Sequence, residues 1–186
     1  MKTKKKILII GGTGFIGYHL AKKSLKKGWK VTSISSNPPK KIRYLSKVKY
    51  LCCDISNRKL LKKIISNYYD YVVNLGGYVD HSNKKKTLKS HYEGCKNLAG
   101  IFLKKPPLSF VQIGSSDEYG DNEAPQIESQ REAPISPYSM GKVGATHFLQ
   151  MLHRTENFPA TTLRLFLTYG PGQNNSRFLP QIIKGC

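Results

Sequence analysis

A short apolar run that leads directly into a glycine-rich turn constrains the fold of this chain most. KKILII (5–10) indicates a buried strand, and GGTGFIG (11–17) then opens a segment with apolar residues at helical spacing. In such a turn Gly11 permits the tight bend, Gly14 lets a diphosphate approach the backbone, and Gly17 lets the helix pack on the strand. Free amide groups at the helix start would face the phosphates. The turn therefore predicts a dinucleotide site.

The rest of the chain alternates between apolar runs and helical segments. We expect further strands at 29–35, 48–54, 69–77, 108–116 and 159–170. We expect helices at 15–28, at 57–68, from the high eighties to Leu103, and from near Pro137 to about Glu156. Near-continuous apolar strands that alternate with helices are typical of a parallel sheet covered on both faces. The predicted fold class is therefore α/β, with a doubly wound parallel sheet.

The charge of the chain is strongly positive, with a formal net value of +20 over 186 residues. From Met1 to Lys105 there are 25 basic residues and four acidic ones, whereas six acids and one arginine lie between Asp117 and Glu132. A basic surface attracts polyanions, so a nucleic-acid binder is one alternative. The lysines are spread over several expected helices and turns without a nucleic-acid motif. We therefore expect a solvated lysine-rich surface and no specific nucleic acid as partner.

The expected cellular location of the protein and the redox state of its cysteines rest on motifs that the sequence lacks. No apolar run approaches the length of a membrane span, and the first ten residues lack the apolar core and cleavage site of a signal peptide. The four cysteines form no C-x-x-C and have no histidine at metal-ligand spacing, so we expect reduced thiols and no metal. They are Cys52, Cys53, Cys95 and Cys186. We predict a cytoplasmic protein without a membrane partner.

The loop after the second expected strand bears on the choice of dinucleotide. An acid that binds an adenosine ribose would stand near Ser35, but the chain has SSNPPKKIR there (35–43). Serines and basic residues suit a 2′-phosphate, so NADP is favoured over NAD, although the lysines also fit the general excess. Asp54 is placed to accept a hydrogen bond from the adenine amino group, or it caps the next helix. The candidate residues of the loop are Ser35, Ser36 and Asn37, with Lys40, Lys41 and Arg43 close by.

The pattern Tyr-x-x-x-Lys occurs three times and marks a candidate catalytic pair. The copies are Tyr18/Lys22, Tyr92/Lys96 and Tyr138/Lys142. The first lies behind the glycine turn, and the second is expected to pack on the sheet. Only Tyr138/Lys142 follows the fifth strand and its loop GSSDEYG (114–120), at the edge where doubly wound sheets bind ligands. Residues four apart share one helix face.

The chemistry of a tyrosine base explains why a lysine is needed beside it. A tyrosine with a pKa of about 10 is a poor base at neutral pH. The ammonium of Lys142 and a positively charged nicotinamide would both favour the phenolate of Tyr138. A hydroxyl on the facing loop, from Ser115 or Ser116, would orient the substrate oxygen. We therefore predict a catalytic group of tyrosine, lysine and serine.

Taken together, these motifs resemble the extended short-chain dehydrogenase/reductase family, which includes nucleotide-sugar epimerases and dehydratases. The resemblance covers nearly the whole chain. It rests on GGTGFIG, Asp54-Ile55, NLGG (74–77), GSSDEYG, SPYSMGK (136–142) and RLFLTYGPG (164–172). It implies an NAD(P)-binding Rossmann domain at 1–170, the start of a truncated substrate lobe at 171–186, a nucleotide-sugar substrate, and a homodimer formed through the helices flanking Tyr138.

The resemblance also implies roles for individual residues. Tyr138 would be the acid/base, and Lys142 would tune it and bind the nicotinamide ribose. Of the two serines we favour Ser116, because this alignment keeps Asp117 and Glu118 on the acidic pair that promotes loss of water in dehydratases. A solvated acidic loop is the alternative for that pair. The cofactor would contact Phe15, Ile16, Asp54, Ile55, Leu75, Gly76, Gly77 and Phe166, besides the glycine turn, Tyr138 and Lys142.

The chain departs from the family pattern at two positions. It has His91 where the family often has asparagine three residues before the glycine of the mid-chain helix, and Leu167 where asparagine follows R-x-F. Our first reading is an NAD(P)-dependent nucleotide-sugar epimerase or dehydratase, with an NADPH-dependent 4-ketoreductase as the alternative reaction. A truncated, non-catalytic dinucleotide-binding module is the alternative of another class.

Overall fold

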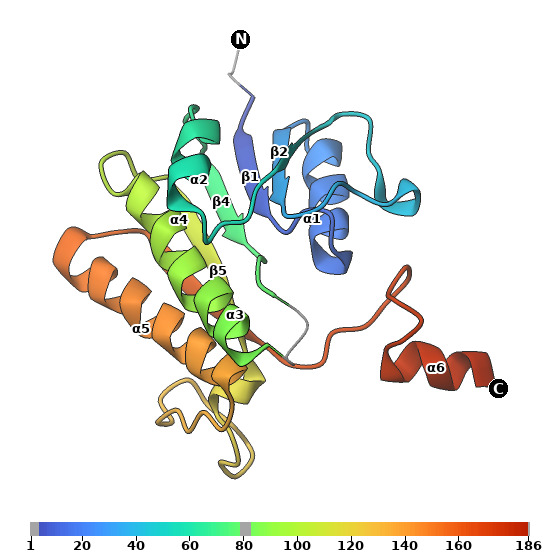
Figure 1. The fold of residues 1–186 in the computed structure, drawn as a ribbon, viewed down its shortest axis with the longest axis vertical. Coiled ribbons are helices and arrows are strands. Elements are labelled where there is room, and N and C mark those ends of the chain that lie inside the picture. Colours follow the sequence, from blue (N-terminus) through green and yellow to red (C-terminus); the bar gives the residue numbers. More distant parts are fainter. Residues whose placement is uncertain (1–3, 79–82, 186) are drawn as a thin grey trace.

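Six parallel strands form the centre of the protein (Figure 1). The computed structural model describes residues 4–78 and 83–185. The strands are β1 Lys6–Ile10, β2 Lys30–Ser35, β3 Val48–Cys52, β4 Tyr71–Asn74, β5 Ser109–Ser115 and β6 Ala160–Leu165. They are arranged in the order β3-β2-β1-β4-β5-β6, with every neighbouring pair parallel. This order is that of a dinucleotide-binding doubly wound sheet, so the predicted fold class is confirmed.

The helices agree with the expected segments, with two differences. They are α1 Phe15–Lys26, α2 Arg58–Ile64, α3 Lys84–Leu88, α4 Gly94–Phe102, α5 Pro137–Glu156 and α6 Phe178–Gly185, with the short turns η1 Lys41–Arg43, η2 Lys89–Glu93 and η3 Ser116–Glu118. The mid-chain helix begins earlier than expected, because the Asn83 side chain accepts a hydrogen bond from the Lys86 amide and so caps it. Helix α6 was not predicted.

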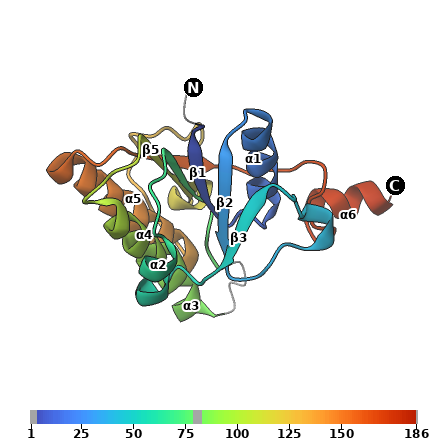
Figure 2. The ribbon, with the colours of Figure 1, turned by 90° about the horizontal axis from the view of Figure 1, so that it is seen from above.

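The two faces of the sheet are covered unequally, as Figure 2 shows. Helix α1 packs on one face, where Ile7 and Ile9 form a small cluster with Ala21 and Val31. Helices α2, α4 and α5 cover the other face with a larger cluster that includes Phe110. Alternate residues of the strands supply the two clusters, since successive side chains point to opposite faces.

The chain after β6 leaves the sheet and crosses towards α1 (Figure 1). His19 Nε2 lies 2.9 Å from the Pro171 carbonyl oxygen, and Arg43 Nη2 donates to the Gly172 carbonyl over 2.9 Å. Helix α6 follows this crossing and has no buried residue. Of the helices in the described ranges, none combines the length and the apolar character needed to cross a lipid bilayer. Cys52, Cys53 and Cys95 are free thiols, and Cys186 lies outside the described residues.

Candidate active site at the carboxyl ends of the strands

The glycine turn has the geometry that the sequence predicts. Gly11 adopts a φ of 78° after β1, and its carbonyl accepts a 3.0 Å hydrogen bond from the Gly14 amide. A Cβ on Gly17 would lie 2.3 Å from the Gly11 oxygen, so only glycine lets α1 approach the turn this closely. Gly14 is the N-cap of α1, and no side chain caps the helix. Its first amides are therefore available to a diphosphate, which fits a dinucleotide.

The loop after β2 lies beside this turn. The Thr13 amide donates to Ser35 Oγ over 3.4 Å, which brings Ser35 next to the turn. Ser36 and Asn37 are exposed, as are Lys40 and Lys41. Arg43, by contrast, is engaged with the Gly172 carbonyl. The loop thus offers two serines and two exposed ammonium groups near the expected ribose position.

Asp54 and the residues after β4 form the neighbouring part of the edge. Asp54 is exposed, and its Oδ1 accepts from the Ser56 amide over 2.8 Å. The cap of α2 is Asn57, whose side chain accepts from Leu60, so the alternative that Asp54 caps this helix is not what the structure shows. Ile55 is 6% exposed and packs in the core. Its side chain therefore faces the core.

The segment Leu75–Gly77 continues β4 directly beneath the glycine turn. A Cβ on Gly11 would lie 3.0 Å from the Leu75 oxygen, so the two backbones are in close contact. The Gly76 amide donates to Asn74 Oδ1 over 3.1 Å. A Cβ on Gly77 would collide with the His91 ring, so a side chain at this position would displace that ring.

Tyr138, Lys142 and a serine come together at the start of α5. Ser136 caps this helix and places Tyr138 in its first turn, with Lys142 one turn later. The Ser115 side chain acts on the phenol of Tyr138 and lowers its pKa, whereas Ser116 is the first residue of the turn η3. The Lys142 Nζ lies 5.6 Å from the centre of the Tyr138 ring. The predicted trio is therefore brought together, with Ser115 rather than the favoured Ser116 beside the phenol.

The protonation of this pair differs from the expectation. Burial raises the pKa of Tyr138, and the hydrogen bond with Ser115 only partly opposes this rise. Burial also lowers the pKa of Lys142 to about 8, although Glu118 acts in the opposite direction. The Lys142 Nζ donates to the Ile113 carbonyl over 2.7 Å. Burial and Ser115 are therefore the main influences on the pKa of Tyr138 in this state.

Glu118 is enclosed in a buried network instead of facing the open edge. Its side chain is completely buried, and it accepts hydrogen bonds from the Ser115 amide (2.9 Å), the Thr146 hydroxyl (3.0 Å) and Arg164 Nε (3.1 Å). Arg164 also pairs with Glu132. Asp117, by contrast, is exposed. The two carboxylates of the expected acidic pair thus lie in different environments, and only Asp117 is accessible.

Two residues of this region, His91 and Arg164, had no predicted role. His91 is 5% exposed, and its ring meets the Tyr138 ring edge to face with the centroids 4.9 Å apart. Its Nε2 lies 3.2 Å from the Tyr78 carbonyl oxygen. Arg164 holds Glu118, and a basic residue inside the apolar run TTLRLFL was the available signal for a buried acidic partner. Phe166, predicted near the nicotinamide, is 59% exposed.

The comparisons with known proteins agree with this geometry. The model of the NAD dependent epimerase/dehydratase family matches residues 7–186. A dTDP-D-glucose 4,6-dehydratase of Dictyostelium discoideum is 31% identical over 96% of this chain and 47% of its own length. A UDP-glucuronic acid decarboxylase 1 of Xenopus tropicalis is 26% identical over 99% of this chain and 47% of its own length. The chain thus spans about half the length of these curated relatives.

Solved structures show the same fold. A UDP-glucose 4-epimerase of Thermotoga maritima has a TM-score of 0.86 at 24% identity, over 92% of this chain and 59% of its own. A UDP-glucuronic acid 4-epimerase of Bacillus cereus, in complex with UDP-glucuronic acid and NAD, has a TM-score of 0.82 at 25% identity, over 96% and 62%. Sheet order, glycine turn and uncapped α1 define a dinucleotide-binding protein of the Rossmann type. The chain belongs to the NAD dependent epimerase/dehydratase family.

Proposed function

We propose that this chain is the coenzyme-binding part of a nucleotide-sugar epimerase or dehydratase in which Tyr138 is the acid/base. The observation that carries the proposal is the placement of Tyr138 and Lys142 on the first turns of α5, with the Lys142 Nζ 5.6 Å from the centre of the Tyr138 ring, at the edge that also holds the glycine turn. Relatives at up to 31% identity act on dTDP- and UDP-linked sugars, which supports a nucleotide-sugar as substrate. Residues 1–170 would form the coenzyme domain, and 171–186 would begin the substrate lobe.

In the proposed mechanism the protein moves one proton and orients one hydroxyl. The Ser115 hydroxyl binds the sugar oxygen and holds it beside Tyr138, which removes the hydroxyl proton or returns it. A bound nicotinamide supplies the hydride acceptor at the sugar carbon, and its positive charge opposes the effect of burial on the pKa of Tyr138. Lys142 adds a second positive charge close to the ring. Asp117 is the accessible acid that a dehydration step would use, whereas Glu118 holds Ser115 in place.

We propose NADP as the preferred coenzyme. Ser35, Ser36 and Asn37 lie where the 2′-phosphate of an adenosine ribose is expected, and no acid stands among them to repel it. Lys40 and Lys41 are exposed on the same loop and would attract that phosphate. The two ammonium groups would act at the adenosine ribose, so they would affect binding of the coenzyme and not binding of the nucleotide-sugar substrate.

We also propose a homodimer through α5 and the end of α3. Leu88 on α3 is 40% exposed, and Met140 and Met151 on α5 are 52% and 44% exposed, which is the apolar surface such a contact would cover. Sedimentation would then give twice the mass of 21.0 kDa, and charged substitutions at Met140 and Met151 would return the monomer.

The reaction is tested by turnover with catalytic amounts of coenzyme. An epimerase or a dehydratase converts a UDP- or dTDP-sugar without added NADPH, because the hydride returns to the sugar. A 4-ketoreductase instead consumes NADPH in proportion to product. The non-catalytic binding module is the alternative. It would be supported if this chain, and a longer chain that includes a substrate lobe, bound dinucleotide but turned over no nucleotide-sugar.

A further inference from the structure

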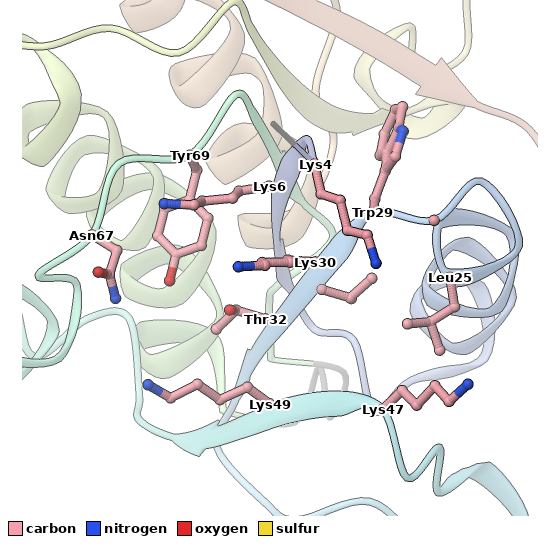
Figure 3. A pocket seen from close by; sticks show the side chains of 12 residues that line it. Lys4, Lys6, Leu25, Trp29, Lys30, Thr32, Lys47, Lys49, Asn67 and Tyr69 are labelled. Atoms are coloured by element: carbon pink, nitrogen blue, oxygen red, sulfur yellow. The ribbon is translucent and has the colours of Figure 1, made fainter. Parts of the chain in front are cut away.

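A second region of the surface gathers positive charge at the opposite end of the sheet. A hollow of about 570 Å³ lies at the amino ends of β1, β2 and β3 (Figure 3). Five lysines line it, and we call it the lysine hollow. They are Lys4, Lys6, Lys30, Lys47 and Lys49. Because the strands bring together residues that are up to 45 positions apart, the fold and not a local run of sequence creates this site.

None of these five lysines has a carboxylate partner within the described residues. Asp70, which does not line the hollow, forms its ion pair with Lys5 and accepts a 2.7 Å hydrogen bond from the Lys6 amide. Five like charges around one concave surface repel one another and focus a positive potential there. A bound anion with several charges would relieve this repulsion.

The wall of the hollow adds neutral hydrogen-bonding groups. Tyr69 is 4% exposed, and Figure 3 shows its hydroxyl pointing into the hollow towards Thr32. Neither the Tyr69 nor the Thr32 hydroxyl forms a hydrogen bond within the ranges 4–78 and 83–185, and both are open to solvent. Lys6, Lys30 and Lys49 lie on the same side of the strands as these hydroxyls. A tyrosine hydroxyl that opens into the hollow among ammonium groups is suited to donate to a phosphate oxygen.

The hollow is separate from the candidate active site. Its lysines begin the strands, whereas the glycine turn and Ser35 follow the strand ends. A strand of five residues spans roughly 16 Å, so the sheet separates the two regions by about this distance. The dinucleotide and a ligand of the hollow would therefore not compete.

We propose that the lysine hollow binds a small anion with several phosphate groups. Its volume lies within the range of small-molecule pockets, about 300–1,000 Å³. A single-stranded nucleic acid would in addition need open aromatic faces for its bases. Here Tyr69 is nearly buried, and Trp29 is stacked on Tyr71 at 4.8 Å with Lys27 over its ring at 5.5 Å. The residues of the wall therefore suit a ligand that carries phosphate groups but no nucleobases.

The test is calorimetric titration with inorganic tripolyphosphate while dinucleotide saturates the glycine turn. We expect binding that weakens steeply with added salt and that falls roughly tenfold in the double variant Lys30→Gln/Lys49→Gln. The matched control, Lys59→Gln/Lys62→Gln, removes two exposed charges from α2, outside the hollow, and should bind within about twofold of the parent. Tyr69→Phe should weaken binding by several-fold with the charge unchanged. Thermal melting of each variant reports whether it is folded.

Three outcomes would overturn the proposal. The first is no binding of tripolyphosphate at low salt. The second is an equal loss in both double variants, which would mean general attraction to a basic surface. The third is tighter binding of an oligonucleotide that depends on Lys30 and Lys49 and displaces tripolyphosphate, which would assign the hollow to nucleic acid.

Discussion

The carboxylate of Glu118 lies 3.1 Å from Arg164 Nε, and the Glu118 side chain has no exposed surface. This pair joins the turn after β5 to the neighbouring strand β6, two segments that are 46 residues apart in the chain. The same carboxylate accepts from the Ser115 amide, so the pair fixes the serine that contacts Tyr138. Burial alone would lower the pKa of Arg164, but hydrogen bonds to Tyr119 and Glu118 outweigh it and raise this pKa.

Removing the arginine of this pair should destabilise the protein strongly. In Arg164→Met the Glu118 charge stays buried without its cationic partner, and we expect the free energy of unfolding to fall by about 3 kcal/mol. Arg154→Met, on the exposed side of α5, is the matched control and should change it by less than about 0.5 kcal/mol. Urea denaturation measures both. Equal, small effects would mean that the pair contributes little.

Lys142 should make stability depend on alkaline pH. Its pKa is lowered by burial to about 8 in the folded state, from an ordinary value of 10.5. The unfolded chain therefore holds this proton over a pH range in which the folded protein has released it. Stability contributed by this group rises from about pH 8 to pH 10.5, by roughly 3 kcal/mol, whereas below pH 8 the cost of the buried charge is fully present.

The measurement compares the parent with Lys142→Met from neutral pH to pH 10.5. The parent should gain roughly 3 kcal/mol relative to this variant over that range, since other groups titrate equally in both proteins. Lys22→Met, on the exposed surface of α1, should show no such gain. A difference between the parent and Lys142→Met that stays constant with pH would contradict the buried ammonium.

The two serines after β5 should differ sharply in their effect on turnover. Ser115→Ala removes the hydroxyl that contacts Tyr138, and we expect kcat/KM to fall roughly a hundredfold. It should also raise the pKa of Tyr138 further, which NMR of ring-labelled tyrosine can follow. Ser116→Ala should stay within about twofold of the parent, and Ser115→Thr should restore part of the activity. A larger loss of kcat/KM in Ser116→Ala than in Ser115→Ala would favour Ser116 as the catalytic hydroxyl.

Lys40 and Lys41 should distinguish NADP from NAD. In Lys40→Gln/Lys41→Gln we expect the dissociation constant for NADP to rise roughly tenfold and that for NAD to stay unchanged, because only NADP carries a 2′-phosphate. Fluorescence titration with both dinucleotides gives the two constants. Lys22→Gln/Lys26→Gln on α1 controls for net charge. If the dissociation constants for NADP and NAD rose equally, the effect would come from the general positive charge and not from the 2′-phosphate.

The alternation of strands and helices was predictable because the signals for it are local. KKILII followed by GGTGFIG carries the first strand, the turn and the helix start within 13 residues, and the remaining apolar runs fill the sheet. Local signals did not determine whether Ser115 or Ser116 lies beside Tyr138. One residue of register turns a side chain to the other face of a strand, and the sequence of the loop does not determine that register.

The roles of charged residues depended on distant partners. Asp117 and Glu118 are adjacent acids in the sequence, but only Glu118 meets Arg164, and this contact becomes visible only when β5 and β6 pair. Likewise, the excess of lysine was plain from composition, whereas the gathering of Lys6, Lys30 and Lys49 required the order of the strands. Helix α6 has no buried residue in the described chain, so no pattern of core-facing apolar residues in the sequence indicated it.

The most direct test is the absorbance of reduced nicotinamide when UDP-glucose or dTDP-glucose is added to the dinucleotide-loaded protein, with this chain and with a longer chain containing a substrate lobe. We expect reduced coenzyme to form and Tyr138→Phe to abolish the signal while its dinucleotide affinity stays within about twofold, since the variant loses only the phenol oxygen. A signal that persists in Tyr138→Phe would contradict the assignment of Tyr138 as the acid/base.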